Sequence, residues 1–104
     1  MCIRDSRWTL HGVSHHLGLD VHDCAQARRE VYRDAPLREG MVLTVEPGLY
    51  IQPDDELFAP EYRGIGIRIE DDVVVTADGC RNISENIPRH PDEIEKWMKS
   101  VLGR

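Results

Sequence analysis

The residues best suited to chemistry lie in one stretch, HGVSHHLGLDVHD, at residues 11–23. It holds four of the five histidines of the chain, two aspartates and glycines that let the backbone turn. Imidazole is the side chain that binds transition metals and exchanges a proton near neutral pH. We therefore expect this stretch to bind a metal, to transfer protons, or to do both.

Two later segments each end in a glutamate and are expected to be β-strands. Residues 41–46 are rich in β-branched side chains, and residues 63–70 alternate isoleucines with glycine and charged residues. The period of two places Glu46 and Glu70 on the polar faces of their strands. The opposite face of the second strand is expected to pack in the core and holds Ile65, Ile67 and Ile69.

If both strands belong to one sheet, the two glutamates converge. Carboxylates that converge in a partly buried site repel each other unless a cation lies between them or one is protonated. His15, Glu46 and Glu70 are therefore the candidate metal ligands. Imidazole and carboxylate without thiolate suit manganese, cobalt, iron or zinc. His11 and His22 are candidates for substrate binding or proton transfer beside the metal.

Arg68 lies two residues before Glu70 on the same strand face, so it can orient a carboxylate or anchor a substrate carbonyl. Each candidate also has an ordinary role. A glutamate at a strand end is usually exposed to solvent, a histidine is more often structural than a ligand, and Arg68 can simply pair with Glu70 or Asp71. Residue types and spacing alone leave both interpretations open.

The rest of the chain must position these residues. Residues 8–19 fit a helix or a loop, residues 20–23 are expected to be extended, and residues 25–34 to form an irregular surface connection or a short helical turn. Residues 49–51 are expected to be extended, and the polar residues 52–62 to form a loop.

Downstream, the pattern predicts a hairpin followed by a helix. Asp71 and Asp72 are expected to turn the chain into a strand over residues 73–76. Asp78-Gly79 is a hairpin signal, with residues 80–84 as the returning strand. The helix predicted over Pro91–Leu102 has acids in its first turn and an apolar stripe of Ile94, Trp97, Met98 and Val101. These elements predict an α/β fold.

Composition narrows the class of protein. The chain of 104 residues is long enough for one small domain. Its net charge of -6 disfavours nucleic acid and anionic membranes as partners. No apolar run approaches the roughly 20 residues that cross a bilayer, and we expect a cytoplasmic location. Residues 1–6 are expected to be a non-native leader. The odd number of cysteines predicts free thiols at Cys2, Cys24 and Cys80.

Three motifs in order resemble the C-terminal part of the catalytic domain of an aminopeptidase P. They are HGVSHHLGLDVHD at 11–23, VLTVEPGLYI at 42–51 and YRGIGIRIEDDVVVT at 62–76. This family is the Xaa-Pro aminopeptidase branch of the pita-bread, or creatinase-fold, metallopeptidases. The resemblance covers residues 7–104 and implies the C-terminal half of a pita-bread fold, a curved and mainly antiparallel sheet with flanking helices.

The resemblance also implies a dinuclear centre of divalent metal, most often manganese, with cobalt or zinc as alternatives. Its ligands in the family are two aspartates, one histidine and two glutamates. His15 resembles the histidine ligand, Glu46 a glutamate ligand that also acts as general base, and Glu70 the glutamate that bridges both metals. His11 and His22 resemble accessory histidines on the substrate side.

Two further residues follow from the resemblance. Arg68 resembles the arginine that supports the site and contacts substrate, and Tyr50 is expected near it as a substrate-binding residue. The two aspartate ligands of the family precede the histidine motif, in a region without counterpart here. Asp20 and Asp23 belong to the histidine motif and are not expected to replace them.

The implied activity is hydrolysis of the N-terminal residue from peptides with proline second, by a metal-activated hydroxide. Such a peptide is the expected partner, and the full-length enzyme is expected to be a homo-oligomer. We expect this chain to be an inactive fragment that exposes apolar surface. Two alternatives stay open: a prolidase, which cleaves only Xaa-Pro dipeptides, and a non-catalytic pita-bread module that binds peptides or partners.

Overall fold

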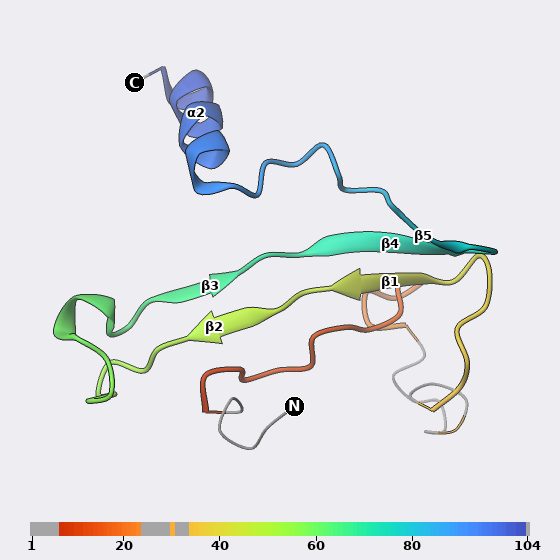
Figure 1. Ribbon diagram of the computed structural model, residues 1–104, viewed down its shortest axis with the longest axis horizontal. Helices are drawn as coiled ribbons and strands as arrows, with labels where there is room; N and C mark the ends of the chain where they lie inside the picture. The colour runs from red at the N-terminus through yellow and green to blue at the C-terminus, as the bar shows by residue number, and fades with distance from the viewer. Residues whose placement is uncertain (1–6, 24–29, 31–33, 104) are drawn as a thin grey trace.

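The computed structural model describes residues 7–23, 30 and 34–103, in which short antiparallel strands form the frame (Figure 1). The described elements, in chain order, are β1 (Val42–Val45), β2 (Gly48–Tyr50), the 3-10 helix η2 (Pro60–Tyr62), β3 (Gly66–Arg68), β4 (Asp71–Thr76), β5 (Gly79–Asn82) and α2 (Pro91–Leu102). One sheet has the order β1-β4-β5, and β2 pairs with β3 in a second. The expected α/β class is confirmed, as are the hairpin after β4 and the bounds of the helix.

One antiparallel register runs through both sheets. β1 pairs with β4 so that Val45 lies opposite Asp71, and β2 pairs with β3 so that Gly48 lies opposite Arg68. Both strands advance by the same number of residues between these two pairs. The two sheets therefore form one long ribbon with a short interruption, as the aligned arrows of β1 with β2 and of β3 with β4 show in Figure 1.

The interruption falls at the two candidate glutamates. Continuing the register places Glu46 directly opposite Glu70. Pro47 has no N–H to donate to the neighbouring strand. The N–H of Glu46 points to the other edge of β1 and donates to the carbonyl of Val13, at 2.8 Å. Residues that lie directly opposite each other on paired strands project to the same face, so the side chains of Glu46 and Glu70 share one face of the ribbon.

The histidine stretch runs along the other edge of β1. The N–H of Leu17 donates to the carbonyl of Val42 at 3.0 Å, and the N–H of Thr44 donates to the carbonyl of His15 at 2.9 Å. Of the helix and the loop that fitted residues 8–19, the structure has an irregular segment, tied to β1 by these bonds.

The prediction of an extended segment over residues 20–23 was wrong. These residues form bends and a turn, and the N–H of Asp23 returns to the carbonyl of His16 at 3.0 Å. Gly18 permits this return, because a side chain there would overlap the carboxylate of Asp23. The alternation of side chains over residues 20–23 describes only neighbouring residues, so it could not predict the bond from Asp23 back to His16.

The prediction of a turn at Asp71 and Asp72 was also wrong, since both residues begin β4. Asp71 pairs with Val45 and Asp72 with Thr44, so cross-strand pairing overrides the turn preference of aspartate. Of the strand expected over residues 63–70, the part that pairs regularly is β3, Gly66–Arg68. The predicted connection over 25–34, apart from residues 30 and 34, lies outside the described residues, as do the expected leader over 1–6, Cys2 and Cys24. Cys80 is a free, exposed thiol, as expected.

Apolar surface is widely exposed. Ile51 is the buried apolar residue of the described chain, whereas Thr44, Glu46 and Asp55 are buried polar ones. The predicted core position of the isoleucine face was wrong, because the described chain leaves that face open: its members are 43–60% exposed, namely Ile65, Ile67 and Ile69. The expectation of exposed apolar surface is thereby confirmed.

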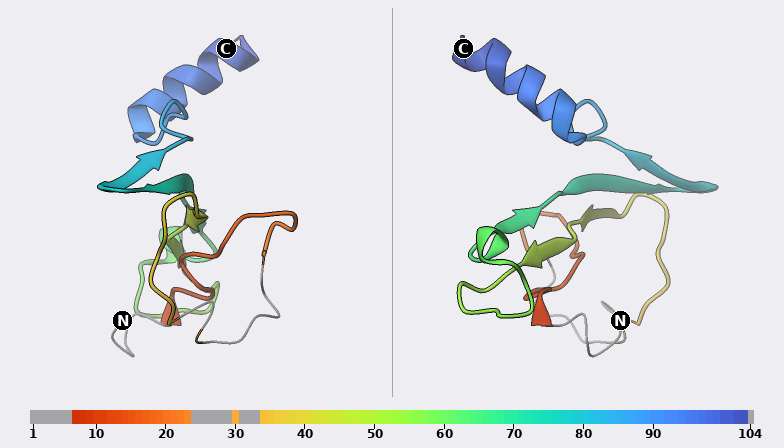
Figure 2. Two further views of the ribbon diagram at one scale, coloured as in Figure 1. Left: turned by 90° about the vertical axis from the view of Figure 1, so that its right-hand side faces the viewer. Right: turned by 60° about the vertical axis from the view of Figure 1, so that its left-hand side comes forward.

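Helix α2 begins at Pro91, and Asp92 and Glu93 lie in its first turn. Gly103 caps its C-terminal end in the left-handed conformation, at φ 65°. Figures 1 and 2 show the helix standing apart from the strands. Three members of its apolar stripe are correspondingly exposed, namely Trp97 at 56%, Met98 and Val101. In the described part of the chain, no helix has the length and apolarity to cross a membrane.

A buried aspartate fastens the start of the described chain to the loop between β2 and β3. The carboxylate of Asp55 accepts from the indole N–H of Trp8 at 2.7 Å, from Nε and Nη2 of Arg7 at 3.2 Å, and from the N–H of Leu57 at 3.1 Å. The Trp8 indole N–H, with help from the Leu57 amide and Arg7, lowers the pKa of Asp55 below its usual 3.8 despite burial. The carbonyl of Trp8 in turn accepts the N–H of Tyr50.

Asp55→Asn is expected to lower the melting temperature of the chain by several degrees, whereas Asp54→Asn, its exposed neighbour, changes it little. A depressed folded pKa contributes stability that is present above the unfolded value and is lost as the pH falls through the folded one. Thermal unfolding from neutral to acidic pH should therefore show a gap between wild type and Asp55→Asn that closes as the pH falls below 3.8. Equal behaviour of the two variants would contradict this role.

Candidate metal centre

The three candidate ligands meet at the gap in the ladder. His15 comes from the segment beside β1, Glu46 follows β1, and Glu70 lies between β3 and β4. One potential ligand atom from each lies within 4.8 Å of the other two, and Nε2 of His15 is 3.2 Å from Oε1 of Glu46. Glu46 is 7% exposed and the side chain of Glu70 is 40% exposed. The group therefore opens to solvent on the Glu70 side.

A hydrogen bond orients the imidazole of His15. Its Nδ1 lies 3.0 Å from the carbonyl of His16. Since a carbonyl only accepts, Nδ1 carries the proton and the neutral ring has its lone pair on Nε2. That nitrogen faces Glu46, and a histidine whose other nitrogen donates to a carbonyl is the usual arrangement of a metal ligand.

Thr44 links two of the candidate ligands, His15 and Glu46, and the sequence analysis missed it. Its hydroxyl accepts the backbone N–H of His15 at 3.1 Å and donates to Oε1 of Glu46 at 3.3 Å. The side chain is 1% exposed. A signal was present in the sequence, because the alternation over 41–46 places Thr44 on the same face as Glu46.

The chemistry of this donor set fits a divalent cation. Two carboxylates approach each other, and Arg68 lies beside both, with Nη1 3.7 Å from Glu46 and Nε 3.9 Å from Glu70. Both distances exceed those of a hydrogen bond, so Arg68 reduces the repulsion without satisfying the oxygens. One imidazole and two carboxylates match the preferences of manganese, cobalt, iron and zinc.

The structure also places His22 at this site. Its ring packs against that of His15, with centroids 4.3 Å apart and the planes at 69°. The turn over residues 18–23 brings this histidine back to the start of the stretch, which the expected extended segment would not have done.

His11 and Tyr50 form a second pair. The hydroxyl of Tyr50 lies 2.6 Å from Nε2 of His11, and Nδ1 of His11 lies 2.7 Å from the carbonyl of Gly12. By the same reasoning, Nδ1 donates and Nε2 accepts the tyrosine proton. Glycines make room for the aromatic ring: a Cβ would lie 2.6 Å from it at Gly48 and 2.8 Å at Gly66. The close approach of the ring explains the glycine within β3.

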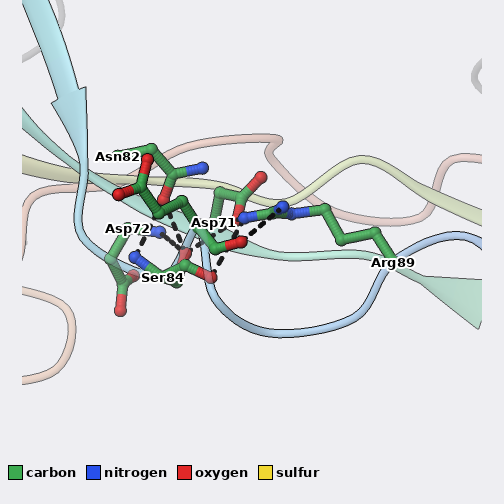
Figure 3. Close-up of polar contacts among 6 residues, drawn as sticks. Asp71, Asp72, Asn82, Ser84 and Arg89 are labelled. Atoms are coloured by element: carbon green, nitrogen blue, oxygen red, sulfur yellow. Dashed lines mark hydrogen bonds and ion pairs between the residues drawn. The ribbon is translucent and has the colours of Figure 1, made fainter. Parts of the chain in front are cut away.

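A second side-chain cluster lies directly behind Glu70. The carboxylate of Asp71 accepts from Nε of Arg89 at 2.8 Å and from the hydroxyl of Ser84 at 2.7 Å (Figure 3). The Arg89 guanidinium, followed by the Ser84 hydroxyl, lowers the pKa of Asp71 to about 2. The ion-pair partner of Asp71 is thus Arg89. Arg68 lies near Glu46 and Glu70, so its alternative pairing with Asp71 is not the one observed.

Comparison with known proteins identifies the family. Residues 4–77 match the model of Metallopeptidase family M24. The chain belongs to this metallopeptidase family. It is 64% identical over 97 residues to Xaa-Pro aminopeptidase 1 of Streptomyces coelicolor, a match that covers 93% of this chain and 20% of that relative. It is 54% identical over 89 residues to Xaa-Pro aminopeptidase of Escherichia coli, covering 86% of this chain and 20% of the relative.

The fold agrees with solved structures of the same family. Aminopeptidase P from Escherichia coli with the inhibitor Pro-Leu superposes with a TM-score of 0.82 at 46% identity, covering 97% of this chain and 22% of that one. The expected relationship to the catalytic domain of a pita-bread aminopeptidase P is thereby confirmed. The chain spans about a fifth of the length of the relatives that it matches.

In a full-length M24 parent, Thr44→Val is expected to weaken metal binding, because it removes the bonds that fix His15 and Glu46. A lost buried hydrogen bond costs about 1–3 kcal/mol. Thr44→Ser retains the hydroxyl and serves as control. Calorimetric titration of the metal-free proteins measures both, and equal metal affinity for Thr44→Val and Thr44→Ser would contradict the role assigned to the hydroxyl.

Proposed function

We propose that this chain is part of a metal-dependent Xaa-Pro aminopeptidase that releases the N-terminal residue from peptides whose second residue is proline. The observation that carries this proposal is the convergence of His15, Glu46 and Glu70 at one gap in the sheet. Relatives with this activity in their names are 54% and 64% identical to the chain, which favours that branch over prolidase. The activity is proposed for the full-length parent.

His15, Glu46 and Glu70 would hold a divalent metal, for which we propose manganese, with cobalt or zinc as substitutes. A Zn-substituted form is known for the Escherichia coli aminopeptidase P. When bound, the metal supplies a Lewis acid that activates water and stabilises negative charge on the substrate carbonyl. We expect the parent to provide two further carboxylates for a second metal.

Glu46 is proposed as the general base. One of its oxygens faces His15 and Thr44 and the other faces Arg68, so the carboxylate is held from both sides. A positioned carboxylate of this kind can take a proton from attacking water and later return it to the leaving amine. The small exposure of Glu46 keeps bulk water from competing for that proton.

The remaining site residues are proposed to handle the substrate. His22, beside the ring of His15, would donate a hydrogen bond to the scissile carbonyl. The Tyr50 hydroxyl holds the imidazole of His11 through Nε2. This pair would form one side of the peptide-binding site with its orientation already fixed. Proline offers no amide N–H at the scissile bond, so recognition must rest on shape and on the neighbouring carbonyls, which Arg68 can reach.

Two wider properties of the parent belong to the same proposal. The exposed free thiol of Cys80 suits a reducing compartment, which supports a cytoplasmic location. A homo-oligomer is proposed for the parent as well, in which a second subunit would cover part of the apolar surface that this chain exposes.

The parent enzyme loaded with manganese is expected to cleave a tripeptide with proline second, and chelation should abolish the reaction. Glu70→Gln should lose about 100-fold or more in activity together with bound metal, since removing a ligand costs at least as much as disturbing the groups around it. Glu56→Gln, in the exposed β2–β3 loop, is the control. Unchanged metal content and activity in Glu70→Gln would favour a binding module, and cleavage of Xaa-Pro dipeptides alone would favour prolidase.

The isolated 104-residue chain is expected to be inactive on the same tripeptide. Three ligands bind a metal weakly, because each missing carboxylate removes both charge and geometry. A sensitive fluorogenic Xaa-Pro assay of the purified chain, with and without excess manganese, measures this. Metal-dependent turnover by the isolated chain would show that the ligands outside it are dispensable.

A further inference from the structure

Glu70 lies at the gap between the two ladders. It falls between β3 and β4, outside both ladders. On the neighbouring strand Pro47 has no N–H to donate, and the N–H of Ile69 reaches the carbonyl of Pro47 at a long 3.3 Å. The Glu70 side chain is 40% exposed and its contact with Arg68 is 3.9 Å long. Its carboxylate therefore depends on how firmly the adjoining backbone is held.

The next residue supplies that restraint from the opposite face. Asp71 accepts bonds from Nε and Nη2 of Arg89 and from the Ser84 hydroxyl. Arg89 also donates to the carbonyls of Ser84 at 3.0 Å and Glu85 at 3.2 Å, so most of its guanidinium is occupied. The N–H of Ser84 is held by Asn82 at 2.8 Å. Figure 3 shows these side chains gathered at Asp71.

The same serine extends the pairing of β4 with β5 toward the metal ligand. The N–H of Asp72 donates to the Ser84 hydroxyl at 3.0 Å, and the N–H of Ile83 donates to the carbonyl of Asp72 at 2.9 Å. One backbone bond and one side-chain bond thus continue the sheet past Asn82, the last residue of β5. They end one residue short of Glu70.

We propose that Asp71, Ser84 and Arg89 are positioning residues that hold Glu70 for the metal centre. This proposal rests on the metal-binding function proposed above. A carboxylate ligand must stay within about 0.5 Å of its productive position. On the β1 side the strand lacks one ladder bond beside Glu70, because Pro47 has no N–H. The clamp formed by Asp71, Ser84 and Arg89 adds restraint from the β5 side and from the opposite face of the strand.

The test is to titrate the metal-free, full-length parent with Mn²⁺ alone. Calorimetry measures the affinity, and electron paramagnetic resonance records the signal of the bound ion. Asp71→Asn is expected to weaken Mn²⁺ binding about 10-fold or more, as loss of outer groups does at metal sites. Ser84→Ala should act in the same direction with smaller size. Asp78→Asn is the matched control, because Asp78 also accepts a hydroxyl bond, from Thr76 at 3.0 Å, but in the exposed hairpin turn.

Mn²⁺ affinity of Asp71→Asn equal to that of Asp78→Asn would overturn the proposal, even if the melting temperature of the metal-free protein falls. If Asp71→Asn does not fold, Ser84→Ala decides: affinity and spectrum like those of the control overturn the clamp, and weakened binding supports it. No peptide enters this measurement. A parent that binds Mn²⁺ but cleaves no Xaa-Pro peptide would therefore refute the proposed activity alone.

Discussion

Repulsion between two carboxylates is the constraint that the site must meet. Glu46 and Glu70 face each other across a gap in the ladder, with potential ligand atoms within 4.8 Å of one another. At such separations like charges are unfavourable unless a cation intervenes. Arg68 stands beside both without reaching hydrogen-bond distance, and His15 offers a neutral nitrogen. A divalent cation would bind the two carboxylates and the imidazole nitrogen, and Thr44 keeps His15 and Glu46 in place.

Alternation in the sequence predicted much of this site. The period of two in VLTVE and GIRIE placed Glu46 and Glu70 on polar faces, and the structure has both on one face. Register was beyond such reasoning, since it depends on which residues of distant segments pair. The turn expected at Asp71 failed for the same reason, because pairing with Val45 decides the backbone there. The contacts of Thr44 with His15 and of Arg89 with Asp71 likewise join residues that no local pattern connects.

The patterns also identified apolar faces without showing what covers them. Ile67 was expected in the core and is 60% exposed, and the stripe of α2 is open in the same way. Amphipathicity marks the face that avoids water, but burial requires a second element to pack on it. The chain spans about a fifth of its relatives, and among the described residues the buried ones are mostly polar, with Ile51 beside Thr44, Glu46 and Asp55 in that class.

The most direct test of the central claim is anomalous diffraction from crystals of the full-length parent grown with manganese. The account predicts an anomalous peak within bonding distance of Nε2 of His15 and of carboxylate oxygens of both Glu46 and Glu70. Manganese bound elsewhere, with no peak between these three side chains, would contradict it.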